Sequence, residues 1–132
     1  MALDVGTKRI GVALSDFMHI LSSGHSCIDR RPETAAVEKI KQIAKENNVK
    51  TIIVGIPINM DGTQGSQAND CLNFGSRFSS EFEVVYEDER LTSEMAEQHL
   101  KQRRVNYSKN KGLIDIESAC IILEQYMGVN RG

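Results

Sequence analysis

The sequence contains no tryptophan, only two prolines and only three cysteines among 132 residues. Cys27, Cys71 and Cys120 are far apart and form no Cys-x-x-Cys pair, so neither a zinc knuckle nor a disulfide framework is indicated. No apolar run approaches the length that spans a bilayer, and the N-terminus lacks the basic and apolar segments of a signal peptide. We therefore expect a reduced cytoplasmic protein with no membrane partner.

The chain also lacks an excess of positive charge, and its formal net charge of -2 argues against a general nucleic-acid coat protein. The range 101–111 differs, because it contains several basic residues and no acid. Such a run is either a solvated loop or a surface that binds phosphates. Its basic members are Lys101, Arg103, Arg104, Lys109 and Lys111.

The first thirty residues are typical of three short strands joined by tight turns. The opening strand carries an acid, Asp4, and a glycine turn over 6–9 leads into the apolar run Ile10–Leu14. The range His19–Ile28 is interrupted by serines and a glycine, which predicts a weaker strand at an edge or with a bulge. These strands predict an antiparallel meander.

Helical and strand patterns alternate in the rest of the chain. Pro32 opens a first helix, and the buried strand Lys50–Pro57 follows it. A less regular second helix leads to a strand over Phe82–Glu89, and a further helix is expected over Leu91–Arg103. A last helix carries an apolar stripe of Ala119, Cys120, Leu123, Tyr126 and Met127.

This order predicts an α/β fold with a mixed five-stranded sheet flanked by helices. The later two strands should run parallel to the first, which lies centrally beside Lys50–Pro57. Because α/β sheets bind ligands at the carboxyl ends of parallel strands, Asp4 and Glu89 are expected at a ligand-binding edge. The chain is expected to form one domain over residues 1–132.

Four stretches in register carry a specific resemblance. They are LDVGTKRIGVALSD (3–16), VGIPINMDGT (54–63), VYEDERLTS (85–93) and KNKGLIDIESACIILEQYM (109–127). Together they resemble the YqgF/RuvX family over nearly the whole chain. That family has a ribonuclease H-like fold, and its members are described as pre-16S rRNA nucleases and formerly as Holliday junction resolvases.

By this resemblance Asp4, Glu89 and Asp115 fall on the family's acidic site positions, as catalytic residues and metal ligands. Hydrolysis of a phosphodiester needs an activated water and a stabilised leaving oxygen, and two divalent ions can supply both. Mg²⁺ and Mn²⁺ prefer carboxylate oxygens, so convergent acids suit them and no histidine or cysteine is required.

Each acid also has a simpler interpretation. Asp4 is costly to bury unpaired in an apolar strand, which favours a functional role. Glu87 is expected to share a face with Glu89 while the acid between them points away, so position alone does not select Glu89. Asp115 lies where the last helix begins and is a favoured N-cap. Glu117 is either an extra site acid or, as we favour, a favourable charge near the helix N-terminus.

Polar residues near these acids are candidates for contacts with nucleic acid. Lys8 and Arg9 lie on the turn that follows Asp4, and a solvated turn is nearly as good an explanation for them. Asn59 follows a parallel strand, and Arg90 follows Glu89 directly. The remaining candidates belong to the basic run and are Arg103, Arg104, Lys109 and Lys111.

The resemblance implies a metal-dependent nuclease, an enzyme that hydrolyses phosphodiester bonds in structured RNA. Its implied task is maturation of the 5′ end of pre-16S rRNA in ribosome biogenesis, with association with ribosomal precursors. A Holliday junction resolvase acting on branched DNA and a non-catalytic nucleic-acid-binding module are alternatives. The DVGTKRIG stretch also resembles the phosphate loop of actin-like ATPases, but 132 residues cannot supply their two lobes.

Overall fold

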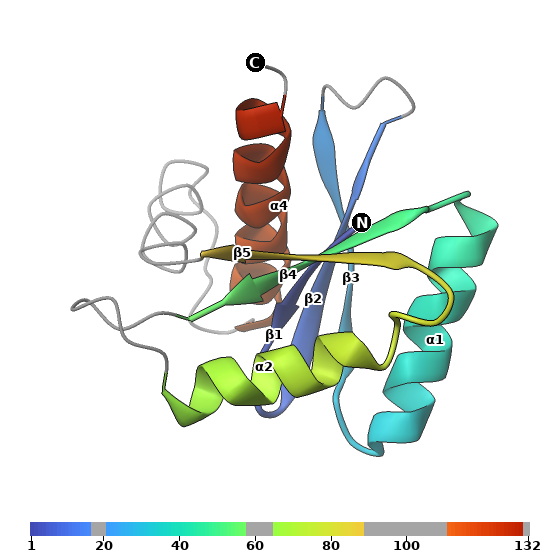
Figure 1. Cartoon of the computed structure of the whole chain (residues 1–132), viewed down its shortest axis with the longest axis vertical. Coiled ribbons are helices and arrows are strands. Elements are labelled where there is room, and N and C mark those ends of the chain that lie inside the picture. The colour runs from blue at the N-terminus through green and yellow to red at the C-terminus, as the bar shows by residue number, and fades with distance from the viewer. Residues whose placement is uncertain (17–20, 58–64, 89–110, 131–132) are drawn as a thin grey trace.

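The computed structural model of the chain describes residues 1–16, 21–57, 65–88 and 111–130. One mixed sheet contains five strands in the order β3-β2-β1-β4-β5 (Figure 1). The strands are β1 (Ala2–Val5), β2 (Arg9–Ser15), β3 (Ser22–Asp29), β4 (Thr51–Ile56) and β5 (Glu83–Asp88). The helices are α1 (Glu33–Glu46), α2 (Ser66–Ser76) and α4 (Lys111–Asn130).

The sheet has the predicted topology. Strands β1, β2 and β3 form an antiparallel meander, whereas β4 runs parallel to β1 and β5 parallel to β4. The third strand lies at an edge, and its pairing with β2 is irregular between Val12 and Ala13, as expected for a bulged edge strand. This mixed sheet flanked by helices confirms the expected ribonuclease H-like α/β fold.

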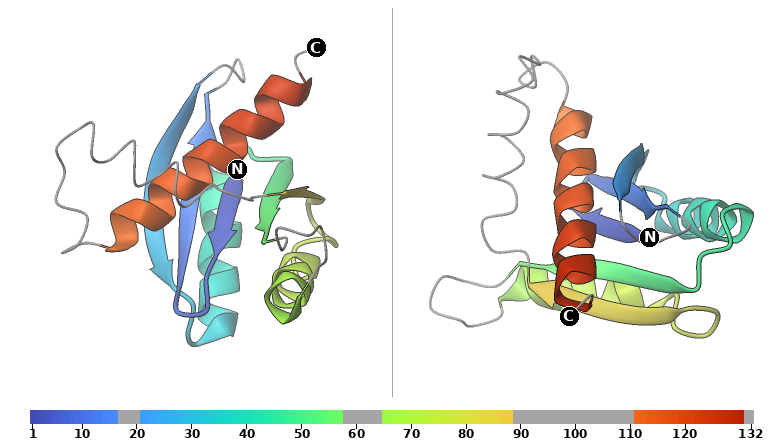
Figure 2. Two further views of the ribbon diagram at one scale, coloured as in Figure 1. Left: turned by 90° about the vertical axis from the view of Figure 1, so that its left-hand side faces the viewer. Right: turned by 90° about the horizontal axis from the view of Figure 1, so that it is seen from above.

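The two faces of the sheet pack against different helices. Leu3 and Val5 belong to the core cluster that contains α1 and α2, whereas Ala2 packs with α4 on the opposite face. Figure 2 shows α4 on one side of the meander and α1 on the other. Because side chains alternate along a strand, Asp4 faces α4.

The helices use the apolar spacing that predicted them. In α1 the buried residues recur at helical spacing, and full burial of a side chain such as Ile40 contributes about 1.5–3 kcal/mol. Pro32 has an extended conformation and serves as N-cap, so the helix begins one residue later than predicted. The predicted stripe of α4 packs on the sheet as expected. No helix in the described ranges combines the length and apolar character needed to cross a membrane.

Arg30 ties the β1–β2 turn to α2. Its side chain is 3% exposed, and its guanidinium makes two hydrogen bonds to Asp70, of 2.6 and 2.7 Å, and one of 3.0 Å to the carbonyl of Gly6. Its backbone N–H donates to the carbonyl of Lys8, and its guanidinium carbon lies 5.1 Å from the centre of the Phe74 ring. The buried side chain of Arg30 therefore fixes the β1–β2 turn against α2.

Candidate active site

Asp4 lies in the central strand, at the carboxyl end of β1. Its Cα is paired with that of Gly11 in β2, and its side chain is half-buried on the face that α4 covers. Asp4 therefore lies at the edge of the sheet that the sequence predicts, the one formed by the carboxyl ends of the parallel strands. All four residues of β1, Ala2–Val5, pair with β2.

Asp115 is brought to the same place by close packing of α4. A Cβ atom built on Gly11 would overlap the carbonyl group of Asp115, so only glycine admits the helix this near to β2. Because Gly11 is the partner of Asp4, the backbone of Asp115 lies beside the first acid. The backbone of one predicted site acid therefore packs on the strand partner of another, on the same face of the sheet.

The alternative interpretation of Asp115 as the N-cap of the last helix is wrong, because α4 begins four residues earlier, at Lys111. The preference for Glu117 as a charge near the helix N-terminus is also wrong, since dipole interactions fall off within the first turn. Glu117 is instead 9% exposed and lies in the second turn.

One oxygen of Asp115 is bonded to Arg9. The Nε of Arg9 donates to Oδ2 at 2.8 Å, and the two side chains are 36% and 21% exposed. The hydrogen bond and the charge of Asp115 raise the pKa of Arg9 above its usual high value. Arg9, a predicted phosphate ligand, is therefore an ion-pair partner of a predicted catalytic acid.

Cys27 is a member of this site that the sequence interpretation missed. It is paired with Gly11 across β2 and β3, and its Sγ donates to the same Asp115 oxygen at 3.8 Å. Burial, followed by the charge of Asp115, raises the pKa of the Cys27 thiol. Counting residues outward from Asp4 through the meander would have found Cys27, since alternation puts both on one face.

Glu87 lies on the α4 face at the end of β5. Val85 packs against the α4 cluster, and alternation directs Glu87 to the same side while Asp88 points to the other. The expected shared face of Glu87 and Glu89 stays a prediction, because Glu89 lies outside the described residues. Burial, then the charge of Asp88, raises the pKa of Glu87.

The other predicted site residues divide into two groups. Lys8 is exposed on the turn that follows Asp4, and Lys111 is the first residue of α4. The rest lie outside the described residues: Asn59, Glu89, Arg90, Arg103, Arg104 and Lys109.

The donor set suits a hard divalent cation. Asp4 and Asp115 offer half-buried carboxylate oxygens. Oδ2 of Asp115 already binds a cationic group, the guanidinium of Arg9. Within the described ranges, no three histidine, cysteine or acidic side chains form a complete metal-binding group.

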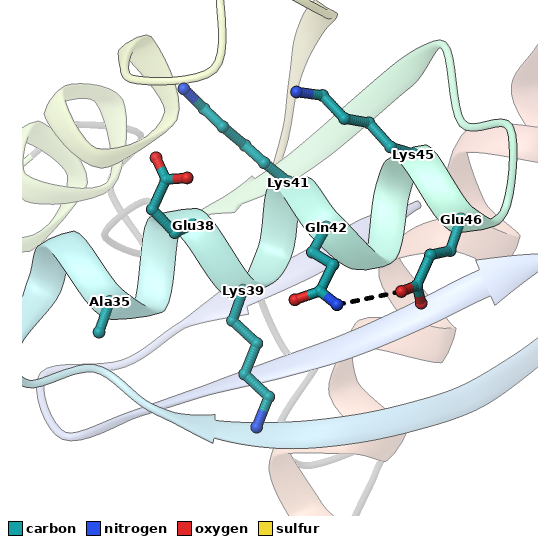
Figure 3. A pocket seen from close by; sticks show the side chains of 7 residues that line it. All are labelled: Ala35, Glu38, Lys39, Lys41, Gln42, Lys45 and Glu46. Carbon is teal, nitrogen blue, oxygen red and sulfur yellow. Dashed lines mark hydrogen bonds between the residues drawn. The ribbon is translucent and has the colours of Figure 1, made fainter.

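A hollow on the outer side of α1 is a different kind of feature (Figure 3). All of its lining residues belong to α1: Ala35, Glu38, Lys39, Lys41, Gln42, Lys45 and Glu46. Gln42 donates to Glu46 at 3.1 Å, and Lys41 and Lys45 pair with Glu81 at 2.7 and 3.0 Å. Figure 3 shows Glu38 and Lys39 pointing in different directions, so the polar side chains do not converge on a common point and the hollow is no candidate site.

Comparison with known proteins adds a consistent result. Residues 1–128 match the RuvX family, described as Holliday junction resolvase. The chain is 41% identical over 133 residues to a protein of Gloeothece citriformis named "Putative pre-16S rRNA nuclease", covering 99% of this chain and 88% of the relative. Proteins of the same name from Trichormus variabilis and Crocosphaera subtropica are also 41% identical, with 88% and 93% of their lengths covered. The chain therefore belongs to the RuvX family.

Proposed function

We propose that this protein is a metal-dependent nuclease of the cytoplasm that hydrolyses phosphodiester bonds in structured RNA during 5′ maturation of pre-16S rRNA. The names of its relatives support the substrate. The observation that supports the chemistry is the packing of the Asp115 backbone on Gly11, the strand partner of Asp4 at the carboxyl end of the central strand.

The two acids would hold Mg²⁺ or Mn²⁺ through hard oxygen donors, with Glu89 as the third ligand that the resemblance implies. Bound divalent ions supply an activated water and stabilise the leaving oxygen of a phosphodiester. Asp4 stands on a sheet strand and Asp115 on a helix packed against it, so neither carboxylate depends on a loop for its position.

The bases around the acids bind the polyanion. Lys8 lies on the β1–β2 turn and Arg9 begins β2, near Asp4, where a phosphate next to the scissile one can be neutralised. Arg30 holds this turn through the carbonyls of Gly6 and Lys8, which limits the freedom of both basic residues. Positive charge here offsets the repulsion between clustered carboxylates and the nucleic-acid backbone.

The test is a cleavage assay with Mg²⁺ or Mn²⁺ on a pre-16S rRNA fragment and, separately, on a four-way DNA junction. Wild type should cut the RNA, and Asp4→Asn and Asp115→Asn should each abolish cleavage while the thermal unfolding temperature changes little. Asp16→Asn is the matched control, because Asp16 is an exposed acid at the opposite end of β2.

The family description makes junction cleavage the specific alternative. Symmetric cutting of the junction without cleavage of the RNA would replace the proposed substrate by branched DNA. Binding of RNA with no cleavage in any divalent metal would instead favour a non-catalytic module. Retention of full activity by Asp4→Asn would refute the site itself.

A further inference from the structure

The Arg9–Asp115 ion pair joins a predicted phosphate ligand to a predicted metal ligand. Its two residues come from the start of β2 and the second turn of α4, which are 106 positions apart in sequence. Both groups are only partly exposed, and the bond is short, with 2.8 Å between Arg9 Nε and Asp115 Oδ2. The same oxygen also accepts from the Cys27 thiol at 3.8 Å.

We propose that this pair couples divalent-metal binding to nucleic-acid binding. Arg9 holds Asp115 in the free protein, and a substrate phosphate draws the guanidinium away and releases the carboxylate to a divalent ion. This inference rests on the proposed function, since it assigns a regulatory role within the same site.

The coupling follows from competition for one oxygen. A guanidinium hydrogen-bonded to Asp115 Oδ2 occupies one direction of approach to that oxygen, and its positive charge repels a second cation. A divalent ion on Asp115 must therefore displace Arg9 or bind with reduced affinity. A ligand that binds more tightly when Arg9 has moved away from Asp115 raises the affinity of the protein for the ion. The bound ion raises the affinity for that ligand by the same factor.

The surroundings of Arg9 allow it to exchange Asp115 for a substrate phosphate. Among the described residues, only its Nε is hydrogen-bonded, which leaves both terminal nitrogens available to the oxygens of a phosphate. Its side chain is the more exposed member of the pair, whereas Asp115 is held by the close contact of α4 with Gly11. Movement of the arginine is therefore easier than movement of the acid.

Lys8 provides a matched comparison. It directly precedes Arg9 in the sequence and carries the same charge, but it is exposed on the turn and makes no ion pair with any described residue. Loss of the Lys8 charge changes the general potential at the site, and loss of Arg9 changes the potential and also frees Asp115. A difference between the two variants therefore isolates the ion pair from the general effect of charge.

The experiment measures Mn²⁺ affinity without relying on turnover. Free Mn²⁺ is followed by electron paramagnetic resonance in the presence and absence of a short RNA with cleavage-resistant linkages, and an RNA-only titration is subtracted. Wild type should bind Mn²⁺ about 5-fold or more tightly when RNA is present, the lower end of typical coupling factors.

Without RNA, Arg9→Gln should bind Mn²⁺ more tightly than Lys8→Gln does. The factor by which RNA increases the Mn²⁺ affinity should be smaller in Arg9→Gln than in wild type. Arg9→Lys keeps the charge but not the planar Nε donor, so it should give an intermediate result. Circular dichroism and the unfolding temperature establish that each variant is folded.

Two outcomes overturn the inference in different ways. If Arg9→Gln and Lys8→Gln show the same Mn²⁺ affinity and the same gain with RNA, the ion pair does not couple the sites, although the nuclease proposal stands. If wild type binds no Mn²⁺ with or without RNA, the metal site and the proposed function fail together with the coupling.

Discussion

Replacement of Gly11 by alanine tests how α4 positions Asp115. The added Cβ would overlap the carbonyl group of Asp115 and would lie 2.9 Å from the backbone nitrogen of Ile116. All of these atoms belong to the helix backbone, so no side-chain rotation can relieve the overlap. Because non-bonded atoms in contact are about 3.5 Å apart, the helix must retreat from β2 by on the order of 1 Å.

The retreat has two measurable consequences. Overpacking of this kind costs about 1–3 kcal/mol in the free energy of unfolding, which urea denaturation measures. Displacement of Asp115 from Asp4 by about 1 Å should reduce the cleavage rate at saturating substrate by up to about 100-fold. The loss of rate should persist at temperatures where the variant is fully folded.

Gly128→Ala is the control, since Gly128 belongs to the same helix and an added Cβ would meet nothing within 4 Å. Better helix propensity should raise the free energy of unfolding by up to about 1 kcal/mol, with cleavage unchanged. If Gly11→Ala had wild-type stability and wild-type turnover, the close approach of α4 would not be what positions the acid, and the reasoning would be refuted.

Three further predictions concern the groups that surround the site. Asp70→Asn removes the bidentate partner of the buried Arg30 guanidinium, and because Asp70 is partly exposed we expect a loss of about 1–3 kcal/mol in urea denaturation. Arg30 also lowers the pKa of Asp70 below 3.8, so the pair stabilises the protein above that pH, and its contribution is lost as the pH falls through the lower folded-state pKa. The wild-type unfolding free energy should therefore fall more steeply than that of Asp70→Asn below about pH 4, and parallel curves would contradict this. Burial raises the pKa of Glu87 above 4.5, so ionisation of Glu87 opposes folding as the pH rises past that value. Glu87→Gln should therefore raise the unfolding temperature at pH 7 and leave it nearly unchanged at pH 4; an equal effect at both pH values would exclude ionisation as the cause.

The sheet was predictable because its signals are local. A run of apolar residues such as Ile52–Ile56 is typical of a buried strand, and connections through helices make such strands parallel to the first. The position of Asp4 follows from the same reasoning, since Asp4 lies near the carboxyl end of the central strand and α/β sheets bind ligands at that edge.

The start of the last helix was not predictable from local signals. Asp115 is a good N-cap and Gly112 a poor helix former, so propensity favours a later start than the observed one at Lys111. Packing of the helix on Gly11 depends on a residue about a hundred positions away. Tertiary contact of this kind routinely overrides propensity.

The contacts of Asp115 were also beyond local reasoning. Its partners Arg9 and Cys27 are 106 and 88 residues distant in sequence, and no periodicity links them. The sequence could show which residue types were present near Asp4. Only the packing of the helix determines which of them donate to Oδ2 of Asp115. Arg9 was accordingly predicted as a phosphate ligand without its ion pair.

The most direct test of the account is the location of Mn²⁺ by anomalous diffraction from crystals of the wild-type protein bound to a cleavage-resistant RNA and soaked in that ion. We predict an anomalous peak at the carboxyl end of β1, with oxygens of Asp4 and Asp115 about 2.1 Å from the ion, and loss of the peak in Asp4→Asn. An ion bound elsewhere, with Asp115 still hydrogen-bonded to Arg9 and no ion on Asp4, would contradict the claim that these acids form the catalytic metal site.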